Sequence, residues 1–252
     1  MRRLIIALAA VAAFALPSTA FGGGVVLKVQ PSSHLVAVAG PARVSLVHTA
    51  AAGRVHVGQR VAVTARTLGN GTLRASKLRI VGRAHEVRFR GMLLHKSATE
   101  LILSAGGAVI AVHRSSSSAP QVGSAVDVHA TFGDDDELDE DHVGVVSARA
   151  PGGTIEGRLS LGTGTITVTS EHMSLVLKVP AGTDLSAFRA GDEVFATFSQ
   201  GADGSLTLTR LSTADDDEDT DEDHHDGEHH GGDDHGGDDH GGGHHGHGGG
   251  DH

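Results

Sequence analysis

The residues best suited to chemistry lie in the last 38 residues of the chain, 215–252. This tail holds 15 Asp or Glu, 10 His, 12 Gly and a single Thr, and it has no basic or apolar side chain. Neutral imidazole suits Zn²⁺, Ni²⁺, Cu²⁺ and Co²⁺, and carboxylates complete their coordination spheres. The tail therefore predicts binding of divalent transition-metal ions.

The predicted metal ligands are the tail histidines and three of the carboxylates that interleave with them. They are His224, His225, His229, His230, His235, His240, His244, His245, His247, His252, Asp226, Asp234 and Asp239. Glycine-rich spacing preforms no site, so we expect several weak sites of poor selectivity that capture or buffer metal. The alternative is a solvated, charged spacer, which is the usual role of an acidic run. No metal is expected as a required cofactor.

The tail also lacks the apolar side chains that would offset the entropy of ordering it, which predicts disorder without a ligand. Its charge contrasts with the rest of the chain. The tail contributes −15 to the net charge of −11, so the remainder carries +4.

Positive charge is concentrated near the N-terminus. Residues 21–85 contain nine basic residues and no Asp or Glu: Lys28, Arg43, Arg54, Arg60, Arg66, Arg74, Lys77, Arg79 and Arg83. This imbalance predicts an anionic partner, either an anionic polymer of the cell envelope or the protein's own acidic tail.

Several functions are disfavoured by what the sequence lacks. Without cysteine there is no disulfide, thiolate metal site or catalytic thiol. No H-E-x-x-H, G-x-S-x-G, S-x-x-K or P-loop motif occurs, so we predict a non-enzyme with no catalytic and no cofactor-binding residues. Without Trp or Tyr, stacking platforms for single strands are scarce, which argues against nucleic acid as a partner.

Residues 1–20 have the features of a secretory signal peptide. Arg2 and Arg3 precede an apolar run over 4–16, and Ser18 and Ala20 supply small residues for cleavage before Phe21. The sequence predicts an exported protein, extracellular, periplasmic or in the cell envelope, with no membrane span after removal of the signal.

Residues 22–212 alternate apolar and polar side chains in short runs, which indicates an all-β fold. Asn70-Gly71 and Asp203-Gly204 predict tight hairpin turns. A single helical turn is expected over 184–188, with Asp184 as its N-cap.

An internal repeat divides this region. The strand pattern G-x-x-V begins at Gly58, Gly123 and Gly191. An earlier glycine opens each unit, at Gly24, Gly91 and Gly157, which are 67 and 66 residues apart (91 − 24 and 157 − 91). We predict three modules, 24–83, 84–150 and 154–212, each a small closed barrel of five strands. Their short links predict packing in a row.

The second module differs from the others. An acidic run over 134–141 replaces its hairpin tip, where we expect a solvated loop; the alternative is a contact with a cation or with a basic partner such as the first module. We make no prediction on whether this barrel closes fully. Arg88 and Arg90 alternate with apolar residues and predict a basic outer face. The histidines of the modules, such as His56, His113 and His129, are expected to be single surface residues, with His129 on the same face as Asp127.

The pattern G-x-V … L-x-V … V-x-V-P … G-D-x-V … D-G-S-L resembles the repeated modules of exported bacterial proteins that are classed as a domain of unknown function. The third module carries it most fully, through Gly157, Ile166 to Val168, Leu177 to Pro180, Gly191 to Val194 and Asp203 to Leu206. The first module has Gly58-Gln59 and the second Gly123-Ser124 in place of Gly-Asp. The resemblance implies an OB-like barrel and export, with no established activity and therefore no functional residues.

Overall fold

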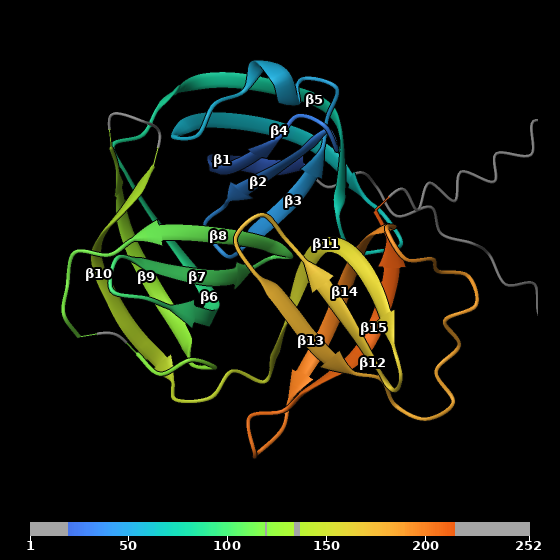
Figure 1. Ribbon diagram of the computed structural model, residues 1–252. Helices are drawn as coiled ribbons and strands as arrows, with labels where there is room; N and C mark the ends of the chain where they lie inside the picture. Colours follow the sequence, from blue (N-terminus) through green and yellow to red (C-terminus); the bar gives the residue numbers. More distant parts are fainter. Residues whose placement is uncertain (1–19, 119, 134–136, 215–252) are drawn as a thin grey trace, which may run out of the picture. The chain divides into compact units, whose positions relative to one another are not determined.

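The computed structural model describes residues 20–118, 120–133 and 137–214, and these form fifteen strands and one short 3₁₀ helix (Figure 1). Barrel 1 comprises β1 (Ala20–Gln30), β2 (Leu35–Ala39), β3 (Val44–His48), the 3₁₀ helix η1 (Ala52–Arg54), β4 (Gln59–Thr67) and β5 (Leu73–Arg83). Barrel 2 comprises β6 (Glu86–Lys96), β7 (Glu100–Ala105), β8 (Ala108–His113), β9 (Ala125–Phe132) and β10 (Leu138–Ser147). Barrel 3 comprises β11 (Gly152–Gly162), β12 (Thr165–Thr169), β13 (Ser174–Lys178), β14 (Glu193–Gln200) and β15 (Leu206–Thr213).

Each barrel closes with the same strand order, 1-2-3-5-4 in its own numbering. In barrel 1 the first three strands form an antiparallel meander, and β3 then pairs with β5 in parallel, through Val47 and Leu73. This is the order of a five-stranded OB-like barrel, so the predicted fold class is confirmed. Barrel 2 closes as well, although it lacks the Asp-Gly turn.

The first of the repeated glycines lets the first strand of each barrel bend against its neighbour. The strand shifts its pairing at this point, from the fourth strand towards the second. A Cβ atom on Gly24 would lie 2.7 Å from the carbonyl oxygen of Ala39, and one on Gly91 would lie 2.8 Å from that of Ser104. Only glycine allows backbones to approach this closely. The second glycine, at Gly58, Gly123 and Gly191, has φ of 80°, 90° and 98°, a left-handed turn into the fourth strand.

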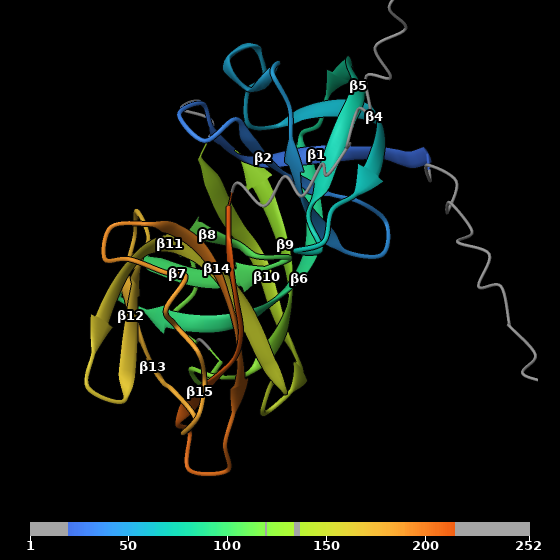
Figure 2. The ribbon, with the colours of Figure 1, turned by 90° about the vertical axis from the view of Figure 1, so that its right-hand side faces the viewer.

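The three barrels do not pack in a row, because each contacts the other two (Figures 1 and 2). The β7–β8 turn lies at their meeting point. A Cβ atom on Gly106 would lie 2.6 Å from the carbonyl carbon of Val44 in barrel 1, and Gly107 forms a β-bridge with Ile155 in barrel 3. Barrels 1 and 3 meet directly where Arg210 Nη2 donates to the Gly69 carbonyl oxygen at 2.6 Å.

The barrels pack against one another because two strands, β7 and β8, are apolar on both faces. Residues 101–105 of β7 and 108–110 of β8 are all buried, so their outer faces need cover. Ile102 and Val109 pack into the core of barrel 3, whereas Leu101 and Ile110 belong to a core formed mainly by barrels 1 and 2, to which Phe195 and Ala214 of barrel 3 also belong. Burial of apolar surface on both faces therefore holds the barrels together.

Two local predictions are wrong. Residues 184–188 form turns and no helix, although Asp184 Oδ1 does accept a hydrogen bond from the Ser186 N–H at 2.8 Å, as a cap would. The acidic run is not a loop throughout, because β10 begins at Leu138. Glu140 lies buried within that strand and accepts from the Ser116 hydroxyl at 2.9 Å, which satisfies one carboxylate oxygen.

Candidate anion-binding face

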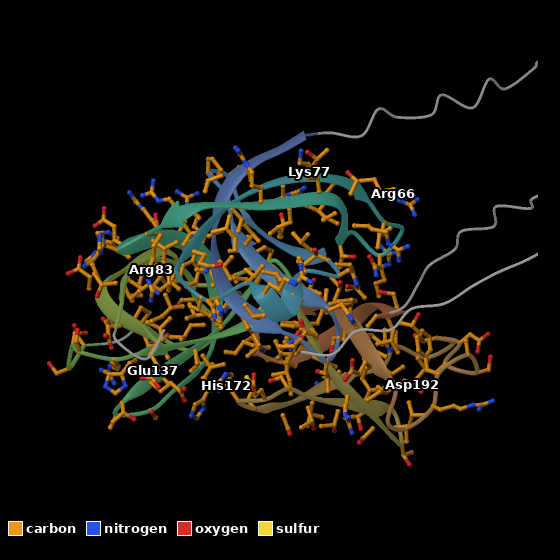
Figure 3. The ribbon with its side chains drawn as sticks, turned by 90° about the horizontal axis from the view of Figure 1, so that it is seen from above. Arg66, Lys77, Arg83, Glu137, His172 and Asp192 are labelled. Atoms are coloured by element: carbon orange, nitrogen blue, oxygen red, sulfur yellow. The ribbon has the colours of Figure 1, made fainter. Side chains whose placement is uncertain are left out.

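Basic side chains gather on the outer surface of the β4–β5 ribbon in barrel 1. Period-2 alternation buries Val61 and Val63 of β4, so Arg60 and Arg66 face outward. The adjoining β5 exposes Lys77 and then every residue from Arg79 to Arg83. Figure 3 shows Arg66, Lys77 and Arg83 spread along this ribbon. We call it the basic ribbon, and it consists of Arg60, Arg66, Arg74, Lys77, Arg79 and Arg83.

A cleft of about 540 Å³ lies between the β2–β3 turn of barrel 1 and strand β6 of barrel 2. The chain leads to it directly, since only Ala84 and His85 separate β5 from β6. Its lining includes the turn residues Gly40, Pro41, Ala42 and Arg43, together with Arg88, Phe89, Arg90 and Asp127. Three arginines and one carboxylate give this lining a net charge of +2.

Asp127 holds two of the three arginines of this cleft in place, and we call the cleft the arginine cleft. Arg88 donates from Nε to Oδ1 at 3.0 Å and from Nη2 to Oδ2 at 2.7 Å, and Arg90 Nε lies 3.6 Å from Oδ2. The hydrogen bond from Arg88 lowers the pKa of Asp127 against the opposing effect of burial, and the same bond raises the pKa of Arg88. Asp127 is therefore ionised at neutral pH, and it fixes one guanidinium in a two-point geometry.

His129 lies next to this pair on the same outer face, as predicted, but it is not an isolated surface residue. Its Nδ1 lies 2.9 Å from Asp141 Oδ2 and its Nε2 lies 3.3 Å from Glu86 Oε2. Together with Arg88, Asp127 and His142, it lines a second hollow of about 410 Å³. The predicted basic face of β6 is thus bordered by carboxylates, Glu86 and Asp141, and by the imidazoles of His129 and His142.

The predicted metal ligands between His224 and His252 all lie outside the described residues, so metal binding by the tail stays a prediction. Within residues 20–118, 120–133 and 137–214, no group of three or more His, Asp or Glu side chains could hold a metal ion. In that same part of the chain, no helix is long and apolar enough to span a membrane.

Sequence reasoning identified Arg88, Arg90 and Asp127 as outward-facing residues but did not bring Arg43 to them. Arg43 belongs to another barrel and approaches only through the packing of barrels 1 and 2. The sequence does indicate that Arg88, Arg90 and Asp127 lie on one face, because each occupies an outward position in its strand. The two strands pair, and Arg90 lies directly opposite Asp127.

Comparison with known proteins gives no family. No family model matches the chain, and no curated protein matches it. Among solved structures it is similar to the p204 HINb domain, with 13% identity over 52% of this chain and 100% of that one, at a TM-score of 0.22. It is also similar to a drosophila protein titled Unr CSD456, with 16% identity over 79% of this chain and 98% of that one, at a TM-score of 0.21.

A third structure is a multidomain protein with nucleic acid binding domains from Streptococcus pneumoniae. It shares 13% identity over 74% of this chain and 71% of that one, at a TM-score of 0.21. Similarities of this extent indicate nothing about function.

Proposed function

We propose that this is an exported, non-enzymatic protein whose barrels bind an anionic polymer of the cell envelope. The observation that supports this most directly is the series of exposed cations that runs along β5 and continues in β6. The basic ribbon supplies repeated charge, and the arginine cleft beyond it supplies guanidinium groups suited to phosphate or carboxylate. Export rests on the N-terminal sequence.

Binding to such a polymer depends on its charged backbone. Phe89, the one aromatic residue in the lining of the arginine cleft, is buried beneath the arginines. Bases would therefore find no stacking surface there, whereas repeated oxyanions would find both spaced charge and a cleft. These features favour a polymer recognised by its charge over a nucleic acid recognised by its bases.

Titration of the full chain with polyphosphate tests this function. Because such binding releases counterions, we expect the affinity to fall at least about tenfold between 50 and 300 mM NaCl. Single-stranded DNA serves as a competitor, and we expect it to displace polyphosphate poorly. No binding, or binding that is indifferent to salt, would contradict the proposal, and stronger binding of DNA would identify nucleic acid as the partner.

Metal capture by the tail is a second candidate, favoured by the ten histidines among its carboxylates. We expect the full chain to bind Cu²⁺ more tightly than Ni²⁺, and Ni²⁺ at pH 7.5 more tightly than at pH 5.5. Imidazoles with a reference pKa of about 6.5 must lose a proton to coordinate, so binding should fail below about pH 6.

Calorimetry measures the binding of Cu²⁺ and Ni²⁺ by the full chain and by a variant in which all ten tail histidines are replaced by glutamine. The variant keeps the length and the carboxylates of the tail. Equal binding by both forms, or undiminished binding at pH 5.5, would assign the metal to carboxylates and reject imidazole capture.

A further inference from the structure

The three barrels meet around a cavity of about 400 Å³ that is lined mainly by charged and polar groups. Barrel 1 contributes Lys28 from β1, barrel 2 contributes residues of β8 and of the starts of β7 and β10, and barrel 3 contributes the β12–β13 turn. The titratable lining residues are Lys28, Glu100, His113, Glu137, Glu171 and His172. Three carboxylates thus share this cavity with one ammonium group.

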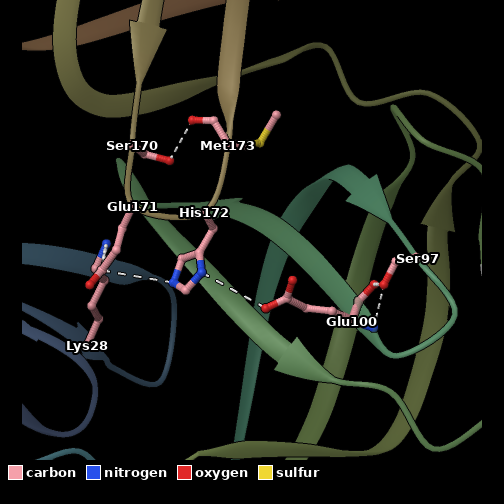
Figure 4. A network of polar contacts seen from close by, with 7 residues as sticks. All are labelled: Lys28, Ser97, Glu100, Ser170, Glu171, His172 and Met173. Atoms are coloured by element: carbon pink, nitrogen blue, oxygen red, sulfur yellow. Dashed lines mark hydrogen bonds and ion pairs between the residues drawn. The ribbon is translucent and has the colours of Figure 1, made fainter.

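Glu171 connects the groups in this cavity (Figure 4). Lys28 Nζ lies 3.5 Å from Glu171 Oε2, and His172 Nε2 lies 3.9 Å from the same oxygen. On the other side of the imidazole, His172 Nδ1 lies 4.0 Å from Glu100 Oε1. All three separations exceed those of direct charge-assisted hydrogen bonds, which leaves room at the carboxylates for another donor.

Glu171 also lines a second cavity, of about 280 Å³, between barrels 1 and 3. Glu193 lines it too and accepts a hydrogen bond from the Ser33 hydroxyl at 3.0 Å. The innermost acid is Glu156, which is only 7% exposed. Gln30 Nε2 donates to its Oε1, but Oε2 has no hydrogen-bond partner among the described residues.

An unpaired carboxylate oxygen at such a depth is costly unless a donor or a cation reaches it. Burial raises the pKa of Glu156, and the positive charge of Lys28 and the Gln30 hydrogen bond oppose that rise. Glu193 and Glu171 add further negative charge that raises the pKa. Glu156 is therefore a buried acid that ionises more readily when a second cation approaches.

The net charge of the residues that line the two cavities indicates the sign of the charge that a ligand would carry. Their acidic residues are Glu100, Glu137, Glu156, Glu171 and Glu193, and their basic residues are Lys28 and Arg158. With histidine neutral, five negative and two positive charges leave −3. Volumes of about 400 and 280 Å³ accommodate a molecule of several heavy atoms and not only a bare ion.

We propose that this junction binds a small organic amine, whose ammonium group is held by Glu171 and Glu156. A primary ammonium group donates up to three hydrogen bonds, which matches carboxylates that approach from more than one strand. Gln30 and Lys28 of barrel 1 lie beside these two carboxylates of barrel 3, so the amine binds where the two barrels meet. This site is separate from the basic ribbon and opposite to it in charge.

Calorimetric titration of the full chain with 1,4-diaminobutane in 150 mM NaCl tests the proposal. We expect one saturable site, whose affinity falls at least tenfold in Glu171→Gln and in Glu156→Gln. Glu86→Gln is the matched control, because Glu86 is an exposed carboxylate outside both cavities, and it should bind as the unaltered chain does. Amine bound by the acidic tail is common to all four proteins and cancels in the comparison.

The comparison requires that each variant folds. Circular dichroism verifies that each variant folds, and Glu171, with a side chain 67% exposed, is a tolerant position. Equal binding by all variants would overturn the proposal, as would a junction that takes Ca²⁺ with the same variant dependence and ignores the amine.

Discussion

Replacing Lys77 and Arg79 together with glutamate is expected to weaken polyphosphate binding on the order of 100-fold in 150 mM NaCl. Both side chains are exposed on β5, at the middle of the basic ribbon. Reversing them removes two attractive charges and adds two repulsive ones along the path of the polymer. The salt dependence of the remaining binding should become shallower, because fewer counterions are released.

The matched control is the pair Lys178→Glu and Arg189→Glu in barrel 3. These residues are also exposed, and the exchange alters the net charge of the protein by the same amount. Isothermal titration calorimetry of the three proteins separates a local surface from a general charge effect. If both double variants lose affinity equally, the protein attracts polyanions only through its overall charge, and the basic ribbon has no particular role.

The sequence was sufficient for the fold because its signals are local and repeated. Alternation in β4 places Val61 and Val63 inside and Arg60 and Arg66 outside, which follows from the two-residue period of a strand. The glycine at each first-strand bend is required by backbone approach. The alternation and the glycine recur in each of the three barrels, so a pattern that is weak in one barrel is supported by its repetition in the other two.

The arrangement of the barrels was not predictable in the same way. A short link predicts that consecutive barrels are neighbours, but it carries no information on whether barrels 1 and 3 touch. The relevant signal was present in β7 and β8, where apolar residues run without alternation from Leu101 to Leu103 and from Ala108 to Ile110. Such a run indicates burial on both faces without naming the partner that covers the outer one.

Both candidate sites, the arginine cleft and the junction cavity, depend on how the barrels pack, so neither could be predicted from the sequence. The arginine cleft needs Arg43 of barrel 1 beside Arg88 of barrel 2. The junction cavity needs Lys28, Glu100 and Glu171, one from each barrel. Residues of like charge were visible along the chain, but which of them share a cavity is decided by surfaces far apart in the sequence. The two sites differ in the sign of their charge, so the proposed anionic and cationic ligands would bind to separate surfaces.

Gly157→Ala is expected to destabilise barrel 3 by about 3 kcal/mol, the upper part of the range for overpacked sites. Its Cβ atom would lie 2.7 Å from the carbonyl carbon of Thr169 and 3.1 Å from the amide nitrogen of Ser170. Both are backbone atoms of β12 or its turn, so no side chain can move aside to relieve the contact. The first strand must then separate from the second, which loses hydrogen bonds of the Arg158–Thr169 pairing.

Thermal unfolding followed by circular dichroism measures this effect, and a loss of about 3 kcal/mol corresponds to a fall in Tm of roughly 6 to 12 °C for a chain of this size. Gly53→Ala is the control, because its Cβ atom would meet nothing within 4 Å and Gly53 does not adopt a left-handed φ. Gly91→Ala should act like Gly157→Ala, since its Cβ atom would meet the Ser104 carbonyl oxygen in the equivalent place. A Gly157→Ala protein that unfolds at the temperature of the Gly53→Ala protein would show that the bend of β11 tolerates a side chain, and the repeated glycine would then need another explanation.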